Sequence, residues 1–166
     1  MEYDVIVNDY PGKGTKVLLK TNYFEVYVNR ACCGIEREKA VRSAFSDWFS
    51  RKAAGLIYER VEFYKAIIGV KYNRIGIKSQ KTRWGSCSSK GNLNFNWRLA
   101  MAPEWIMDYV IIHELCHLIH MNHSKEFWGT VASYMPDYEK AIIWLKENGG
   151  KLKITDLEGK AWIAEK

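Results

Sequence analysis

Apolar and polar residues alternate within residues 1–30, which predicts β-strands there. In the segment NYFEVYVNR, the apolar residues Phe24, Val26 and Val28 are separated by Glu25 and Tyr27. Successive side chains of a strand point to opposite faces, so this period of two predicts one buried face. The preceding YPGKGTK is typical of a turn, and its glycines lack the spacing of a phosphate-binding P-loop.

Between residues 35 and 69 the spacing of apolar residues changes to that of a helix. Apolar side chains recur at intervals of three and four from Val41 to Ile57, with charged residues between them. Glycine is unfavourable inside a helix, so Gly55 is a candidate break that would divide the stretch into two helices.

Short alternating segments return between residues 70 and 99, in VKYNRIGIKSQ, KTRWGSCS and NLNFNWRL. The SSKGN sequence between the last two segments predicts a hairpin turn, with Gly91 able to take a positive φ. We expect these segments to form an antiparallel sheet.

Three further helices are predicted after residue 101. The first begins with Pro103 in its opening turn, where Glu104 complements the positive end of the helix, and it ends near Asn122. The second follows Ser124, a favourable N-cap residue, and the third ends at Gly149. The tail from residue 151 is polar and predicts little.

The composition is that of an ordinary globular protein. The 166 residues are 48% hydrophobic and 27% charged, and we expect one domain over residues 1–166. No apolar run approaches the roughly 18 residues that span a membrane, and no secretory signal is evident. The four cysteines form no CxxC pair, so we expect no disulfide framework and a cytoplasmic location.

The net charge of +6 has two interpretations. It can serve solubility alone, or it can attract nucleic acid or another polyanion. The lysines and arginines are spread along the chain without a long basic block, which favours the first interpretation.

All four histidines lie in one short stretch, HELCHLIHMNH, from His113 to His123. His113 and His117 are four residues apart, so on a helix they lie one turn apart on the same face and can bind one metal ion. Glu114 follows His113 directly and can reach a water molecule at that metal. This is the HExxH arrangement of two ligands and one general base. Two buried core histidines would be the structural alternative.

A catalytic zinc usually has three protein ligands, so a third ligand is needed. His120 lies seven residues after His113, about 10 Å farther along a continuing helix. His123 is the better candidate, because a helix that ends near Asn122 lets the chain fold back toward the metal. Glu126 is a weaker candidate. Cys116, inside the motif, is expected to pack in the core.

Residues 80–128, QKTRWGSCSSKGNLNFNWRLAMAPEWIMDYVIIHELCHLIHMNHSKEFW, closely resemble the YgjP-like metallopeptidase domain family, which is related to SprT-like and other HExxH zincin domains. The TRWGSCS strand, the NWRL strand, HELCH and the later histidine follow the family's order. The resemblance implies a zincin-like α+β fold in which a small antiparallel sheet packs on the HExxH helix and flanking helices. It also implies one zinc ion bound by His113, His117 and His123, with Glu114 as general base. Related families often have glycine at the position of His120, so we expect the chain to turn later here.

The resemblance implies a metal-dependent hydrolase, and three functions compete. The first is a peptidase, acting on a peptide or protein substrate, in which Glu114 takes a proton from a zinc-activated water. The second is a nucleotide pyrophosphatase, an activity to which family members are also linked. The third is a non-catalytic domain stabilised by a metal. Glu114 argues against the third function, because a purely structural site needs no general base.

Several residues outside the motif are candidates for substrate contacts. They are Arg83, Trp84, Arg98, His120 and Tyr134. The two arginines and the tryptophan suit a phosphate and a base, whereas His120 suits a pocket wall or a contact to a metal ligand. Arg83, Tyr134 and Tyr138 are candidates to stabilise an oxyanion, although core packing is the simpler interpretation of each tyrosine. NLNFNWRL is either an edge strand that pairs with an extended peptide or an ordinary strand.

Overall fold

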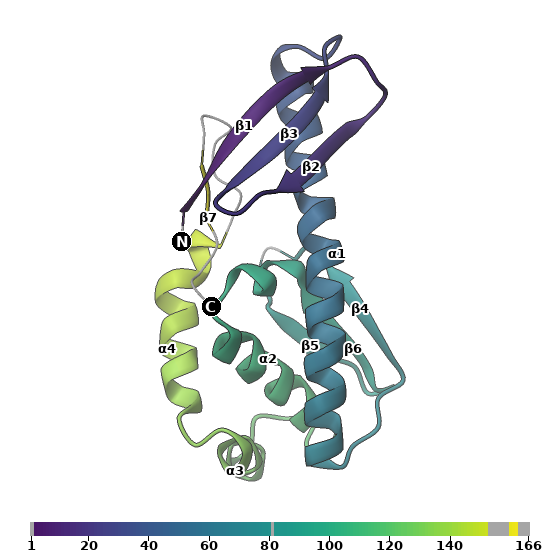
Figure 1. Cartoon of the computed structure of the whole chain (residues 1–166). Coiled ribbons are helices and arrows are strands. Elements are labelled where there is room, and N and C mark those ends of the chain that lie inside the picture. Colours follow the sequence, from purple (N-terminus) through teal and green to yellow (C-terminus); the bar gives the residue numbers. More distant parts are fainter. Residues whose placement is uncertain (1, 81, 153–159, 163–166) are drawn as a thin grey trace.

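Two small sheets lie along one long helix in this computed structural model, which describes residues 2–80, 82–152 and 160–162. The helices are α1 (Gly34–Ile68), α2 (Glu104–Cys116), α3 (Lys125–Tyr134) and α4 (Tyr138–Asn148). Figure 1 shows the N-terminal sheet beside the first half of α1, and the second sheet and the shorter helices beside its second half. Most of the polar tail predicted from residue 151 lies outside the described residues.

The N-terminal sheet confirms the alternation in the sequence. Its strands are β1 (Glu2–Tyr10), β2 (Thr15–Leu19), β3 (Tyr23–Asn29) and β7 (Lys160–Trp162), in the order β2-β3-β1-β7. β3 pairs in parallel with β1 and antiparallel with β2. Phe24, Val26 and Val28 are fully buried between the sheet and α1.

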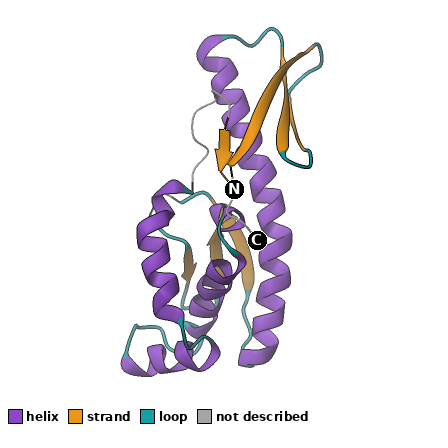
Figure 2. Ribbon diagram, turned by 60° about the vertical axis from the view of Figure 1, so that its left-hand side comes forward, coloured by secondary structure: helices purple, strands orange, loops and turns teal. Residues whose placement is uncertain are grey.

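Helix α1 runs without a break through Gly55, so the predicted division into two helices is wrong. Ala53 and Ile57, on either side of the glycine, are both fully buried. Burial of this apolar stripe outweighs the cost of about 1 kcal/mol for one glycine in a helix. Figure 2 shows α1 spanning the length of the molecule and joining its two halves.

Aromatic rings connect the core of the N-terminal sheet to the second half of the molecule. The ring of Phe24 lies 5.2 Å from those of Phe45 and Trp48 in edge contacts. On the same face of α1, Phe49 stacks on Trp97, with 5.7 Å between ring centroids. The two sheets therefore share one continuous hydrophobic core along α1.

The second sheet has the order β4-β6-β5, with β4 (Arg74–Lys78), β5 (Gly85–Cys87) and β6 (Asn92–Asn96). β5 and β6 form the expected antiparallel hairpin, in which Gly91 has a φ of 69°. β4, however, pairs in parallel with β6, so the prediction of an antiparallel sheet is wrong for β4. β6 is consequently the central strand, and the edge strand on the side of the histidine motif is β5.

The NWRL segment is not a continuation of β6. Residues Trp97–Met101 form a 3-10 helix, η1, which begins where the side chain of Asn96 accepts a hydrogen bond from the backbone N–H of Arg98 at 3.2 Å. A side chain that bonds the backbone two residues ahead replaces the strand ladder with a turn. The chain thus leaves the sheet at Asn96 and leads into α2.

Helix α2 ends at Cys116, earlier than the predicted end near Asn122. The next turn is tighter: the N–H groups of Leu118 and Ile119 donate to the carbonyl oxygens of Leu115 and Cys116, both at 3.0 Å. The chain therefore turns before His120, not later as expected. Cys116 itself is fully buried in the core, as predicted.

The predicted start of α3 after Ser124 and the predicted end of α4 at Gly149 are confirmed. The Ser124 hydroxyl accepts from the N–H of Phe127 at 3.4 Å and caps α3, and α4 is followed at Gly149 by the 3-10 turn η2 (Gly149–Lys151). Arg60 of α1 holds α2 in place, because its Nε donates to Asp108 at 2.7 Å and its guanidinium also pairs with Glu104.

The four cysteines are free, as expected from their spacing. None of the helices in the described part of the chain combines the length and apolar character that crossing a bilayer requires.

Candidate metal centre and active site

Three of the four histidines converge at the end of α2. His113 lies in the last turn of α2, His117 caps its end, and His123 comes from the connection to α3. Their candidate ligand nitrogens all lie within 4.8 Å of one another, and the Nε2 atoms of His113 and His123 are 3.0 Å apart. Two nitrogens on a tetrahedral zinc ion are about 3.3 Å apart, so this grouping fits one metal ion.

Hydrogen bonding orients one imidazole for metal binding. Nδ1 of His117 lies 3.0 Å from the backbone carbonyl oxygen of His120. A carbonyl oxygen can only accept, so Nδ1 of His117 carries the proton and its Nε2 keeps a free lone pair. A hydrogen bond from the ring nitrogen that does not bind the metal fixes the ring orientation of a metal-binding histidine.

Burial keeps these imidazoles in the form that binds metal. Desolvation, reinforced by the nearby His117 and His123, lowers the pKa of His113 to about 3. Burial also lowers the pKa of His117, although its bond to the His120 carbonyl opposes this. Both rings are therefore neutral at pH 7, and no proton competes with a metal ion for their lone pairs.

Glu114 is buried beside the cluster, with only 5% of its surface exposed. Burial raises the pKa of its carboxyl group to about 8, and the positive charge of Arg83 opposes this shift. Its Oε2 atom is buried without a hydrogen-bond partner among the described residues. An unpaired carboxylate oxygen in a buried position is costly unless a ligand, water or cation completes it.

Gly85 of β5 makes room for Glu114. A Cβ atom at Gly85 would lie 2.5 Å from Oε1 and 2.6 Å from Cγ of Glu114, closer than side-chain atoms approach one another. Strand β5 therefore runs directly over the carboxylate only because residue 85 is glycine. Sequence analysis missed this role, although the glycine stands in the TRWGSCS motif.

We expect Gly85→Ala to impair the site without unfolding the protein. The atoms that a methyl group meets belong to one flexible side chain, so the Glu114 carboxylate is displaced while the backbone stays in place. A displacement of about 1 Å can lower turnover roughly a hundredfold. Hydrolysis rate and zinc content, measured together, check this: the rate should fall and the metal should remain.

Gly55→Ala is the matched control. Apart from its chain neighbours and the backbone of α1 itself, no atom of the described residues lies within 4 Å of a Cβ at Gly55. This variant should therefore keep full activity and gain up to about 1 kcal/mol in free energy of unfolding. Equal activity of the two alanine variants would show that Gly85 does not position Glu114.

Two cavities meet at the histidine cluster. One, of about 390 Å³, is lined by the three clustered histidines, Glu114 and the residues of β5. The other, of about 240 Å³, is lined by Trp84, Tyr109 and Leu145 beside His113 and Glu114. Arg83 lines both cavities. The structure therefore brings Arg83 and Trp84 to the predicted metal site.

Tyr109 is a site residue that sequence analysis did not single out. Its hydroxyl lies 3.5 Å from Nδ1 of His113, and the side chain is 6% exposed. Burial, with the nearby Glu114 carboxylate, raises its pKa. Its position four residues before His113 places it on the same helix face, and this spacing was the available signal.

The remaining predicted residues line neither of these two cavities. His120 places its Nε2 3.1 Å from the Thr130 hydroxyl and contributes its carbonyl to His117, so it supports the cluster. Tyr134 is not among the lining residues of either cavity, and Tyr138 stacks on Trp128 at 5.1 Å. Glu126 is exposed in the first turn of α3, outside the histidine group. Arg98 lines a neighbouring cavity.

The model of the YgjP-like metallopeptidase domain family matches residues 10–148. Among solved structures, the metallopeptidase zymogen jannalysin of Methanocaldococcus jannaschii is 22% identical, with a TM-score of 0.50 over 55% of this chain and 95% of that one. The metallopeptidase zymogen abylysin of Pyrococcus abyssi is 26% identical, with a TM-score of 0.49 over 54% of this chain and 93% of that one. A comparison with curated proteins found no match.

The family match covers most of the chain, including β2, β3, the whole second sheet and the HELCH motif, and the likeness to jannalysin concerns the fold. The predicted zincin-like α+β fold and the predicted resemblance are thereby confirmed. The chain belongs to the YgjP-like metallopeptidase domain family, a family of metal-dependent hydrolases.

Proposed function

We infer that the protein is a zinc-dependent peptidase in which Glu114 is the general base. The observation that carries this proposal is the buried Glu114 carboxyl group beside three converging imidazoles, with one oxygen that has no hydrogen-bond partner among the described residues. A zinc ion held by His113, His117 and His123 would supply an electrophile for the scissile carbonyl and for water. The cluster of three neutral nitrogen donors suits zinc better than magnesium or calcium, which prefer oxygen ligands.

Glu114 then performs the proton transfers of the reaction. The positive charge of a bound zinc ion would favour the ionised form of its buried carboxyl group. The carboxylate takes a proton from the attacking water and delivers it to the nitrogen of the leaving amine. Arg83, which lines both cavities at the site, is placed to stabilise negative charge that develops on the carbonyl oxygen. Arg83 is therefore a better candidate for this role than Tyr134 or Tyr138, which line neither cavity.

The position of strand β5 favours a peptide as the substrate. It is the edge of its sheet, and its first residue, Gly85, lies against Glu114. An extended peptide that pairs with a free strand edge gains backbone hydrogen bonds with little dependence on sequence. We propose that the substrate backbone docks along β5, not along NLNFNWRL, whose residues Asn92–Asn96 form the central strand.

Product analysis tests the proposed activity. The zinc-loaded protein is incubated with a mixed peptide library and, separately, with nucleoside triphosphates. We expect new amino termini from the peptides, and loss of this activity after chelation of the metal. Release of pyrophosphate without peptide cleavage would instead assign the site to nucleotide hydrolysis, and no hydrolysis of either substrate would favour a non-catalytic metal domain.

A further inference from the structure

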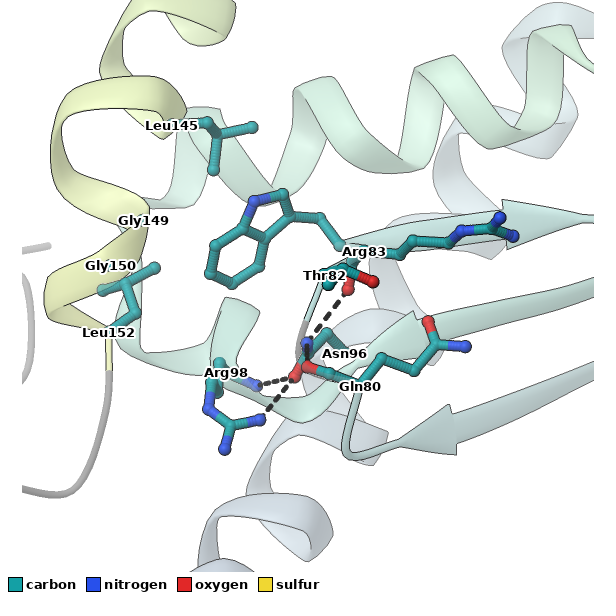
Figure 3. Close-up of a pocket in the computed structure, with 10 residues that line it drawn as sticks. Gln80, Thr82, Arg83, Asn96, Arg98, Leu145, Gly149, Gly150 and Leu152 are labelled. Atoms are coloured by element: carbon teal, nitrogen blue, oxygen red, sulfur yellow. Dashed lines mark hydrogen bonds between the residues drawn. The ribbon is translucent and has the colours of Figure 1, made fainter.

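A third cavity, of about 370 Å³, adjoins the two at the histidine cluster (Figure 3). Arg83, Trp84 and Leu145 line both this cavity and the one beside Glu114. It lies where the chain enters β5, so it continues the edge along which we propose that a substrate docks. The opposite wall is formed by Gly149 and Leu152 at the end of α4.

A buried asparagine holds the walls of this cavity in place. Asn96 is 2% exposed, and its Nδ2 donates to the carbonyl oxygens of Gln80 at 2.7 Å and Arg83 at 3.0 Å. Its Oδ1 accepts from the backbone N–H of Arg98 at 3.2 Å and from Nη1 of the same residue at 3.4 Å. Asn96 therefore ties Gln80 and Arg83, on one wall of the cavity, to Arg98 on another.

The fit between Trp84 and Gly149 closes the cavity on one side. A Cβ atom at Gly149 would lie 2.7 Å from Cζ2 of Trp84, so the end of α4 approaches the indole closely. Trp84 lines both the third cavity and the cavity beside Glu114, so the two share this side chain as a wall.

Arg98 has no carboxylate partner in the described part of the chain. Its guanidinium contacts neutral oxygens of Ser79 and Asn96, both at 3.4 Å, and lies over the ring of Trp97 at 4.6 Å. The described residues that line the cavity include no acidic one. Burial lowers the pKa of Arg98.

Arg60 of α1 differs from Arg98 in that its partners are acidic. Arg60 is also partly buried, but it pairs with Asp108 and Glu104, and these contacts raise its pKa. Arg98 is held in position by neutral groups, and its charge faces a cavity. A fixed, partly desolvated guanidinium without a counter-charge is a site for a carboxylate, which it can bind through two parallel hydrogen bonds.

We propose that this cavity is a specificity subsite in which Arg98 binds the carboxylate side chain of an aspartate or glutamate in a peptide substrate. The inference rests on the proposed peptidase function, because the peptide lies along β5. Residues of an extended strand advance about 3.3 Å each, so the acidic residue occupies a position some residues from the scissile bond. Arg83 extends in a different direction from Arg98 in Figure 3, so the two arginines serve different parts of the substrate.

The test uses one cleavable peptide with glutamate, glutamine or lysine placed in turn at each position around the scissile bond. For the wild-type protein we expect kcat/KM to favour glutamate over glutamine about tenfold to a hundredfold at one position. Arg98→Gln should abolish this ratio, Arg98→Lys should keep part of it, and Arg98→Glu should reverse it in favour of lysine. A purely structural role of Arg98 would not reverse a preference.

Arg51→Gln, which removes an exposed arginine of α1 outside the three cavities, is the control and should leave the ratio unchanged. Thermal unfolding shows whether each variant folds, and the Gln and Lys variants decide the result if Arg98→Glu does not. Peptide cleavage without a glutamate preference, or with one that Arg98→Gln leaves intact, refutes the subsite alone. A wild-type protein that cleaves no peptide refutes the peptidase function and this inference together.

Discussion

The Glu114→Gln variant should keep its zinc and lose about three orders of magnitude in kcat for peptide hydrolysis. Glutamine has the same shape as glutamate, so it fits under Gly85, but its amide cannot take a proton from water. General base catalysis contributes about 10²–10⁴-fold to such reactions. The three imidazoles that form the proposed metal site are not altered. Elemental analysis and turnover at saturating substrate, made on the same preparation, measure the two properties separately.

Glu139→Gln, an exposed change on α4, is the control for the loss of one negative charge and should preserve both activity and zinc. If Glu114→Gln instead hydrolyses peptides at the wild-type rate, another group must act as the base. If the Glu114→Gln variant loses its zinc, Glu114 helps to hold the metal. Its position beside the cluster does not explain such a role.

The part of the site that depends on local spacing could be predicted from the sequence. The interval between His113 and His117 follows from helix geometry, and Ser124 marks the start of α3 by its capping chemistry. These features need only a few neighbouring residues. The same holds for the alternation around Val26, which a buried strand face requires.

Other features depend on contacts between distant segments, and these were predicted wrongly or missed. The parallel pairing of β4 with β6 leaves β5 at the edge, yet the three segments look alike in the sequence. Gly55 does not break α1 because packing of both halves of the molecule holds the helix together. Gly85 gains its role only when β5 lies over Glu114, which the sequence of either segment does not reveal.

The end of α2 shows how an incorrect local prediction still led to the correct grouping. We expected a helix that ends near Asn122, whereas α2 ends at Cys116 and the chain makes a tight turn. The turn frees the His120 carbonyl to bond His117 and lets His123 approach His113. The grouping of the histidines requires only that the chain reverses direction before His123. A helix that ends at Cys116 and a helix that ends near Asn122 both allow this reversal.

The His123→Ala variant should lose its metal, because it removes one of the three nitrogens that converge at the site. Loss of a group that merely orients a ligand lowers metal affinity about 10–100-fold, so loss of a ligand should exceed a hundredfold. We expect zinc to be absent from the purified variant and peptide hydrolysis to disappear with it. Titration with zinc under a competing chelator measures the change in affinity.

Two control variants separate His123 from the other candidates for the third ligand. His120→Ala removes the ring that contacts Thr130 but keeps the carbonyl that orients His117, so its zinc affinity should fall by no more than about tenfold. Glu126→Gln, exposed on α3, should retain wild-type affinity. A His123→Ala protein that binds zinc fully, while either control loses it, would move the third ligand to that residue. The turn after α2 would then have to present a different side chain to the metal, and the proposed three-histidine site would be wrong.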